Sequence, residues 1–330
     1  MKHKKRLIIM ATLTLLLSAC GKRDVRHDIS EYILETDYKE NFRILQLNDI
    51  HLSNKDKLER EFDFMDLTIK EADADLIVIC GDSFTFADKR TAKSLFNFID
   101  SYNTFWTITF GNHDEQCYFS IDWLTDYLNN FGSYCLFKDI QDDDITGNAN
   151  FAINLMKDDK VHYQVIIMDS NRYNFGEYLG YDYIKDNQIA WYERLVNHTR
   201  VENAGVVVPS IAFFHIPIPE FDTAYKKALQ GEADAILEYG DQREAVCAPK
   251  YNSGFFTKAK ELNSTKAICV GHDHINNTRV LYQGVYLCYG INANDRVYGD
   301  DDRLGGHVVT IHNDQTLSFD YLYHTYQEVE

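Results

Sequence analysis

Apolar runs and helical spacing alternate from residue 43 onward. Residues 43–47, with the sequence Arg-Ile-Leu-Gln-Leu, predict a strand, and residues 76–80 form a continuous apolar run, which is typical of a strand covered on both faces. Apolar residues recur at helical spacing over 58–69 and over about 89–102, and a further strand is predicted at 105–110. This β-α-β-α-β order predicts a parallel sheet with right-handed crossovers.

The rest of the chain carries weaker but similar signals. Loops are predicted at 169–183, which is rich in Tyr, Asn and Gly, and at 232–251. The other predicted elements are a helix at 120–131, a hairpin of 151–156 with 161–168, a helix at 188–196, a strand at 211–214, a helix ending near Gly231, a helix opening at 253–256, a strand at 266–270, and two hairpins, 280–282 with 285–289 and 308–312 with 316–321. The two hairpins predict an antiparallel C-terminal part. Without a repeat or a linker, we expect one α/β domain over residues 41–330.

The N-terminus has the pattern of an export signal. Four cations lie within residues 2–6, an apolar run covers 7–17, and Ser18 and Ala19 precede Cys20. The residues around Cys20 resemble the lipobox of bacterial lipoproteins. We therefore expect a signal peptide at 1–19, a lipid on Cys20, a tether at 20–40, and an extracytoplasmic protein anchored to a bacterial membrane. An ordinary secretory signal and an uncleaved anchor are the alternatives.

The net charge of −18 narrows the choice of partners. Nucleic acids and anionic lipid headgroups are recognised by basic surfaces, so neither is expected as a partner. An anionic substrate requires a local cation that reverses the field, such as a metal cluster.

Cysteine usage gives no zinc motif and no disulfide assignment. Cys80, Cys269 and Cys288 lie in apolar, strand-like runs, where small buried thiols pack as hydrophobes. Three others, Cys117, Cys135 and Cys247, lie nearer predicted loops, and their spacing leaves their pairing open.

Polar clusters follow the predicted strands at their carboxyl ends, where open α/β sheets bind ligands. The clusters, in chain order, are Asp49-x-His51, Gly81-Asp82, Gly111-Asn112-His113-Asp114, His215 and Gly271-His272-x-His274. Carboxylate and amide oxygens mixed with imidazoles suit Mn²⁺, Fe or Zn²⁺, and the lack of thiolates disfavours a structural zinc site. Each cluster alone is ordinary turn or capping chemistry, and His215 alone reads as a core histidine; only their joint placement favours a site.

These clusters resemble, in order, spacing and strand context, the motifs of the calcineurin-like metallophosphoesterase superfamily, which includes the purple acid phosphatases. The resemblance covers roughly residues 43–275. Residues 213–220 and 252–256 are similar to those of a purple-acid-phosphatase-like subgroup. The fold that it implies is a four-layer α/β/β/α sandwich.

The resemblance also implies a role for each residue. Asp49, His51 and His274 would bind a first metal, Asp82 would bridge, and a second metal would be completed by Asn112, His215 and His272. His113 would contact substrate and protonate the leaving oxygen, and Asp114 would orient the His113 imidazole. Arg172 and the nearby tyrosines could line a substrate rim, although a solvated loop is the favoured interpretation.

The implied activity is metal-dependent hydrolysis of phosphate esters, by in-line attack of a metal-bridging hydroxide. We expect a small phosphoester or phosphoprotein substrate and monoester hydrolysis. A phosphodiesterase or nucleotidase, and a non-catalytic metal-containing lipoprotein that binds a ligand, stay open. Purple acid phosphatases carry a tyrosine three residues after the bridging Asp, where this chain has Thr85 followed by Phe86. The sequence therefore predicts a colourless protein without a ferric tyrosinate.

Overall fold

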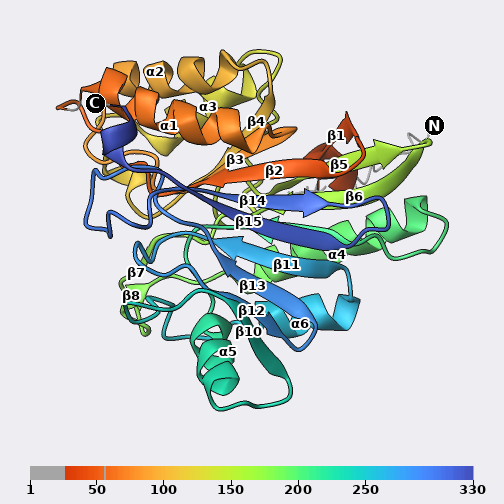
Figure 1. The fold of residues 1–330 in the computed structure, drawn as a ribbon. Coiled ribbons are helices and arrows are strands. Elements are labelled where there is room, and N and C mark those ends of the chain that lie inside the picture. Colours follow the sequence, from red (N-terminus) through yellow and green to blue (C-terminus); the bar gives the residue numbers. More distant parts are fainter. Residues whose placement is uncertain (1–26, 56, 330) are drawn as a thin grey trace, which may run out of the picture.

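The computed structural model describes residues 27–55 and 57–329 and contains two large sheets (Figure 1). The first has the order β15 (Leu317–Tyr323), β14 (Gly305–Ile311), β2 (Phe42–Leu47), β3 (Leu76–Cys80) and β4 (Phe105–Thr109). The second has the order β1 (Ile33–Asp37), β5 (Phe151–Lys157), β6 (Lys160–Ile167), β9 (Ser210–Phe213), β11 (Thr265–Val270), β13 (Val285–Tyr289), β12 (Arg279–Tyr282) and β10 (Ala235–Tyr239). A small hairpin joins β7 (Tyr173–Asn174) to β8 (Gly180–Tyr181).

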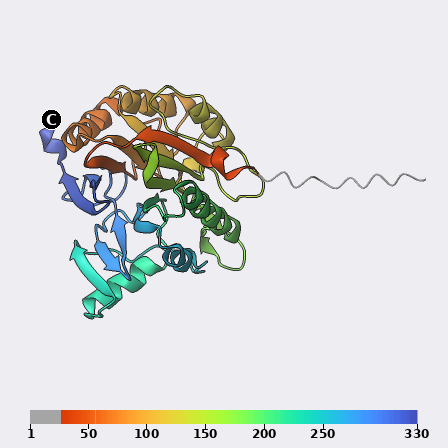
Figure 2. The ribbon, with the colours of Figure 1, turned by 90° about the vertical axis from the view of Figure 1, so that its right-hand side faces the viewer.

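Helices cover the outer face of each sheet, which gives the expected α/β/β/α layering (Figure 2). The first outer layer consists of α1 (Leu58–Ala72), α2 (Lys89–Asp100) and α3 (Ile121–Asn129), and the second of α4 (Asp186–Glu202), α5 (Glu220–Leu229) and α6 (Phe255–Leu262). Short 3₁₀ turns lie at η1 (Ile29–Tyr32), η2 (Asp114–Gln116) and η3 (Tyr326–Glu328). The mixed α/β fold class predicted from the sequence is confirmed.

Local sequence explains the central elements. All five residues of β3 are buried, as a strand covered by a helix layer and by a second sheet requires. Asp88 accepts hydrogen bonds from the amides of Arg90 and Thr91, which caps α2 at its N-terminus. β2, β3 and β4 pair in parallel, as predicted, while β14 pairs antiparallel with β2.

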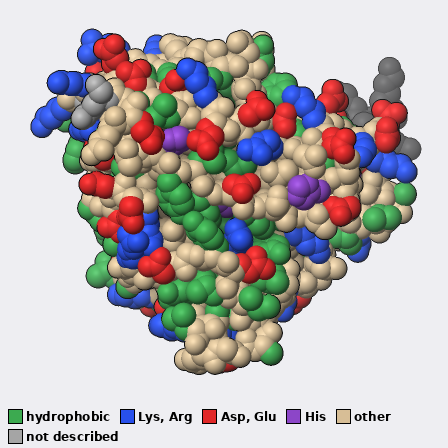
Figure 3. Space-filling view, viewed as in Figure 1, with side chains coloured by type: hydrophobic (Ala, Val, Ile, Leu, Met, Phe, Trp, Pro, Cys, Tyr) green, Lys and Arg blue, Asp and Glu red, His purple; other side chains and the backbone are tan. Residues whose placement is uncertain are grey.

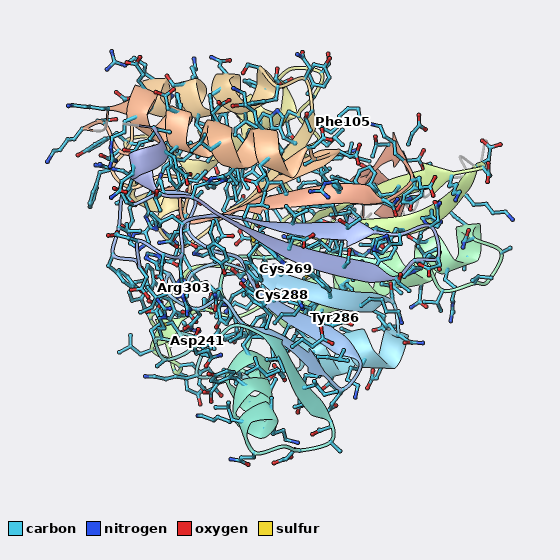
Figure 4. The ribbon with its side chains drawn as sticks, viewed as in Figure 1. Phe105, Asp241, Cys269, Tyr286, Cys288 and Arg303 are labelled. Carbon is cyan, nitrogen blue, oxygen red and sulfur yellow. The ribbon has the colours of Figure 1, made fainter. Side chains whose placement is uncertain are left out.

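The C-terminal strands confirm the two predicted hairpins, β12–β13 and β14–β15, but they do not form a separate antiparallel unit. β13 pairs in parallel with β11, so that Cys269 and Cys288 lie side by side in the sheet (Figure 4). Both thiols are buried, as is Cys80, which confirms their packing role. All six cysteines of the described residues are free.

Two segments expected to be irregular belong to the large sheet. β1 pairs in parallel with β5, and the buried Tyr32 precedes it, so the tether expected over residues 20–40 does not extend through this segment. β10 lies within the predicted loop 232–251 and pairs antiparallel with β12. Both are edge strands with mostly accessible side chains, and their hydrophobic pattern is correspondingly weak.

The predicted signal peptide and Cys20 lie outside the described residues. Within residues 27–55 and 57–329, no helix combines the length and the apolar character needed to cross a membrane.

Candidate metal centre

Five strand ends from the two sheets carry the candidate ligands. β2, β3 and β4 of the first sheet and β9 and β11 of the second end at the edge drawn at the left of Figure 1. The candidates are Asp49 and His51 after β2, Asp82 after β3, Asn112 after β4, His215 after β9, and His272 and His274 after β11. Not one of these seven side chains is more than 7% exposed.

Six of them form two groups of three. Asp49, His51 and His274 place one donor atom each within 4.8 Å of one another, and Asp82, His215 and His272 do the same. Asp82 Oδ2 faces both groups, since it lies 3.0 Å from His215 Nε2 and 3.7 Å from His51 Nε2. This is the place that a bridging carboxylate occupies, and the two groups fit a dinuclear metal centre.

Neighbouring groups fix the outer nitrogens of three histidines. His215 Nδ1 lies 3.0 Å from the carbonyl of Cys80, and His274 Nδ1 lies 2.9 Å from the carbonyl of Tyr298. A carbonyl can only accept, so each Nδ1 carries a proton and each Nε2 faces the centre. His51 Nδ1 lies 2.8 Å from the Thr85 hydroxyl, which stands where purple acid phosphatases carry a tyrosine.

Several buried polar atoms of the centre lack a protein partner. These include Asp49 Oδ1, His51 Nε2 and Asn112 Oδ1. Buried polar atoms are rarely left unsatisfied, because each costs free energy comparable to a lost hydrogen bond. Cations between the two groups would satisfy them, and the mixed oxygen and imidazole donors suit Mn²⁺, Fe or Zn²⁺. The residues therefore fit two metal ions.

The backbone of the centre is strained. Asp49, His51, Asp82 and His272 all adopt positive φ angles, of 55°, 49°, 48° and 75°. Residues other than glycine pay about 1–3 kcal/mol for such a conformation, which persists where the surrounding fold imposes it. Four of the seven candidate ligands have positive φ angles, which indicates a site whose geometry lowers the stability of the fold.

Two glycines allow the strand ends to approach one another. A Cβ on Gly81, where φ is 82°, would lie 2.5 Å from the ring of His215. One on Gly111 would lie 2.2 Å from Asp82 Oδ1. Neither neighbour can yield, because both belong to the buried centre. The glycine that precedes Asp82 and the one that precedes Asn112 are thus required by the packing of the ligands.

The charges of the buried centre are interdependent. Burial opposes ionisation of His215, but the charge of Asp82 and its hydrogen bond outweigh burial and raise the His215 pKa to about 10. Burial likewise opposes ionisation of Asp82, yet His215 holds the pKa of that carboxyl well below its usual range. Burial, reinforced by the charge of His215, lowers the pKa of His272 to about 3. The centre is therefore built to keep Asp82 ionised and His272 neutral.

The expected role of Asp114 as the partner of His113 is wrong. His113 Nδ1 lies 2.9 Å from Gln116 Oε1, whereas the Asp114 carboxylate accepts hydrogen bonds from the amides of Gly111 and Phe84. The side chain of Asp114 is thus turned toward the loops beneath the centre. Burial and the charge of Asp82 raise the pKa of Asp114 to about 8, although the hydrogen bonds from the two amides act to lower it. The His113 ring itself lies 5.1 Å from that of His51, beside the centre.

Two tyrosines of the β7–β8 hairpin contact the centre, in a segment for which the sequence favoured a solvated loop over a substrate rim. Tyr173 accepts a hydrogen bond of 3.0 Å from Asn112 Nδ2, which leaves Asn112 Oδ1 for a cation. The ring of Tyr181 meets the ring of His272 edge-on at 4.4 Å. The surplus of tyrosine in this segment was the available signal, but spacing alone does not separate a site wall from a solvated loop. Arg172 pairs with Glu115 at 2.6 Å.

Comparison with known families places the chain. The calcineurin-like phosphoesterase family model matches residues 42–276, and the chain belongs to this family. The match runs from the start of β2 to just beyond His274, so it includes all of the clusters described above.

Curated relatives are similar over different shares of their length. "Probable inactive purple acid phosphatase 29" of Arabidopsis thaliana is 29% identical over 78% of this chain and 73% of its own. "Phosphatase DCR2" of Saccharomyces cerevisiae is 32% identical over 56% of this chain, which covers 33% of the yeast protein. The plant relative is thus named an inactive purple acid phosphatase, and the yeast relative is named a phosphatase.

Solved structures support the fold. A dimetal phosphatase from Danio rerio superposes with a TM-score of 0.56 at 11% identity, over 83% of this chain and 94% of its own. GAP50 of Plasmodium, titled the anchor in the inner membrane complex, gives 0.52 at 12% identity over 88% and 87%. At such identities the likeness concerns the fold alone.

Proposed function

We propose that this protein is a metal-dependent phosphoesterase that hydrolyses phosphate monoesters. The observation that carries the proposal is the convergence of two buried ligand groups on Asp82, with unsatisfied donor atoms directed between them. Family membership agrees with this chemistry, and the Danio rerio protein of similar fold is titled a dimetal phosphatase.

Each residue has a chemical task in this proposal. Asp49, His51 and His274 would hold one cation, Asn112, His215 and His272 would hold the other, and Asp82 would contribute to both. When bound, the metal pair supplies Lewis-acid polarisation of the phosphoryl group and lowers the pKa of water. His113, whose Nδ1 is directed to Gln116, keeps Nε2 for proton transfer to the leaving oxygen.

A second candidate is a protein that binds metal and ligand without turnover. The word "inactive" in the names of several plant relatives favours it. The complete set of candidate ligands favours the enzyme, because a carboxylate, an amide or an imidazole is present wherever the centre requires one.

Steady-state assays of the Mn²⁺-loaded protein separate the two candidates. The substrates are p-nitrophenyl phosphate, bis-p-nitrophenyl phosphate and a panel of phosphomonoesters, phosphodiesters and nucleotides. The proposal expects turnover that disappears with a chelator and returns with metal, with monoesters preferred. Ligand binding without turnover of any phosphoester would identify the second candidate.

Export and anchoring by a lipid on Cys20 belong to the same proposal, on the strength of the N-terminal pattern alone. Labelling of the full chain with a fatty-acid probe, compared with Cys20→Ser, tests this part independently of activity.

A further inference from the structure

A pocket of about 610 Å³ opens directly beside the metal centre. Its lining includes the ligand His51 and the residue that hydrogen-bonds it, Thr85, so the pocket is continuous with the centre. A volume of this size is within the range of small-molecule sites. Whatever is attached to a phosphoryl group held at the centre can therefore extend into this space.

Two aromatic side chains stand in the wall of this pocket. Phe86 is 58% exposed and Tyr118 is 70% exposed, although both rings are large and mainly apolar. The amide of Tyr118 donates to the carbonyl of Ala87 at 2.8 Å, which holds the two segments side by side. Rings that are solvent-exposed within a concave site are available for stacking on a ligand.

The backbone of Phe86 supports the same interpretation. Its φ angle is 54°, in the left-handed region, which is a marked outlier for a bulky residue. A strained conformation that exposes a phenylalanine gains nothing in folding, because burial of the ring would stabilise the protein instead. The strain is explained if the ring serves a ligand.

The charge of the pocket suits an anionic ligand. Lys55 and Arg296 line it, Arg296 also pairs with Glu61 at 3.7 Å, and among its described lining residues there is no Asp or Glu. A separate hollow of about 230 Å³, lined in part by Tyr173, the hydrogen-bond partner of Asn112, also contains Glu115, Asp169 and Asp182 beside Arg172. Figure 3 shows acidic and basic side chains interspersed over the face of Figure 1. An anionic ester is therefore favoured on the Lys55 side.

We propose that this pocket receives the leaving group of the phosphoester, and that Phe86 and Tyr118 select esters whose leaving group carries an aromatic ring. The inference rests on the proposed phosphoesterase activity and adds a substrate class to it. In the bound ester the phosphoryl group lies at the centre and the ring lies against the two aromatic side chains. These two residues determine specificity and take no part in proton transfer.

The test compares phenyl phosphate with glycerol 2-phosphate, using the Mn²⁺-loaded full chain. Phe86→Leu and Tyr118→Leu keep an apolar side chain and remove the ring. Each variant is expected to lower kcat/KM for phenyl phosphate by roughly 3- to 10-fold, mainly through KM, because a ring-on-ring contact is lost. Activity on glycerol 2-phosphate is expected to stay within about twofold of the original. Leu229→Ala is the control, because Leu229 is a similarly exposed apolar residue at the end of α5. It should change kcat/KM for neither substrate.

An equal loss on both substrates, or no loss on phenyl phosphate, would overturn the inference. Failure of the underlying activity is distinguished by calorimetry with two inert anions, phenylphosphonate and methylphosphonate. If the protein hydrolyses no ester, the inference about the pocket is still supported when phenylphosphonate binds more tightly than methylphosphonate and Phe86→Leu abolishes that difference. Equal affinity for the two phosphonates would exclude it.

Discussion

At the scale of single residues, the candidate metal ligands depend on side chains that are not themselves candidate ligands. Thr85 is the clearest case, because its hydroxyl holds His51 Nδ1 at 2.8 Å. Such outer partners orient a ligating ring, and their loss costs about 10- to 100-fold in metal affinity. The position that differs from purple acid phosphatases thus retains a structural task.

Thr85→Val is therefore expected to weaken metal binding by about 10- to 100-fold at the site that includes His51, as measured by competition with a metal-chelating dye. Thr85→Ser keeps the hydroxyl and is the matched control, expected to bind as the original does. If both variants bind metal alike, the hydroxyl does not position His51.

His113→Ala is expected to retain both metals by elemental analysis and to lose turnover by about 10²- to 10⁴-fold, the usual contribution of a general acid. His198→Ala, which removes a ring that pairs with Glu202 along the outer helix α4, is the control and should remain active. Loss of metal in His113→Ala would show that this imidazole is a ligand rather than a proton donor.

A pH-dependent contribution to stability comes from His307. This histidine is fully buried between β2 and β15, with Nδ1 2.9 Å from Gln46 Oε1 and its ring stacked on Tyr321. Burial, with the charge of Arg279, lowers its pKa to about 3. A depressed pKa contributes stability that is present above the unfolded value of about 6.5 and is lost as the pH falls toward 3.

Between pH 7 and pH 5 the original protein is accordingly expected to lose roughly 2 kcal/mol more stability than His307→Gln. Denaturant unfolding of the two proteins at each pH measures this difference. Parallel pH profiles would mean that His307 is protonated in the folded state.

At the scale of elements, loops between strands are held together by buried polar contacts. Arg303, 2% exposed, donates to the carbonyls of Asp241 and Ile275 and pairs with the Asp241 carboxylate (Figure 4). It thereby joins the loop after β10 to the loop that carries His274. This arrangement couples the stability of the large sheet's edge to the position of a metal ligand.

Arg303→Met is expected to lower the free energy of unfolding by about 2–3 kcal/mol, because buried carbonyls lose a charged donor while most of the apolar stem is kept. Urea denaturation measures the loss. Arg243→Met, which removes an exposed cation paired with Asp300 and Asp302, is the control and should cost under about 1 kcal/mol. Equal losses would show that Arg303 has no special role.

The sequence predicted the buried elements well and the edges poorly. β3 is predicted to the residue because both of its faces are covered, which leaves a continuous apolar run. β1 and β10 were missed because an edge strand needs few apolar side chains. Edge pairing is decided by the backbone of the neighbouring strand, and a pattern of side chains does not record it.

At the scale of the whole molecule, the two sheets place the candidate ligands. Parallel strands that end at one edge bring together residues that are far apart in sequence, such as Asp49 and His274, whose ligand atoms lie within 4.8 Å of one another. The order of the motifs along the chain was therefore enough to identify them. The hydrogen-bond partners of the outer imidazole nitrogens were harder to predict from the sequence. His113 contacts Gln116 instead of Asp114, and Asn112 contacts Tyr173. Both contacts depend on the path of the loops, which the spacing of residues along the chain does not specify.

The most direct test of a catalytic dinuclear centre is to titrate the metal-free protein with Mn²⁺ while p-nitrophenyl phosphate turnover is followed. We expect turnover to rise to a plateau at two equivalents per chain. We also expect Asp82→Asn, which alters the shared carboxylate, to show neither the plateau nor stoichiometric binding. Two tightly bound equivalents without turnover of p-nitrophenyl phosphate or of any other phosphoester would contradict a catalytic dinuclear centre.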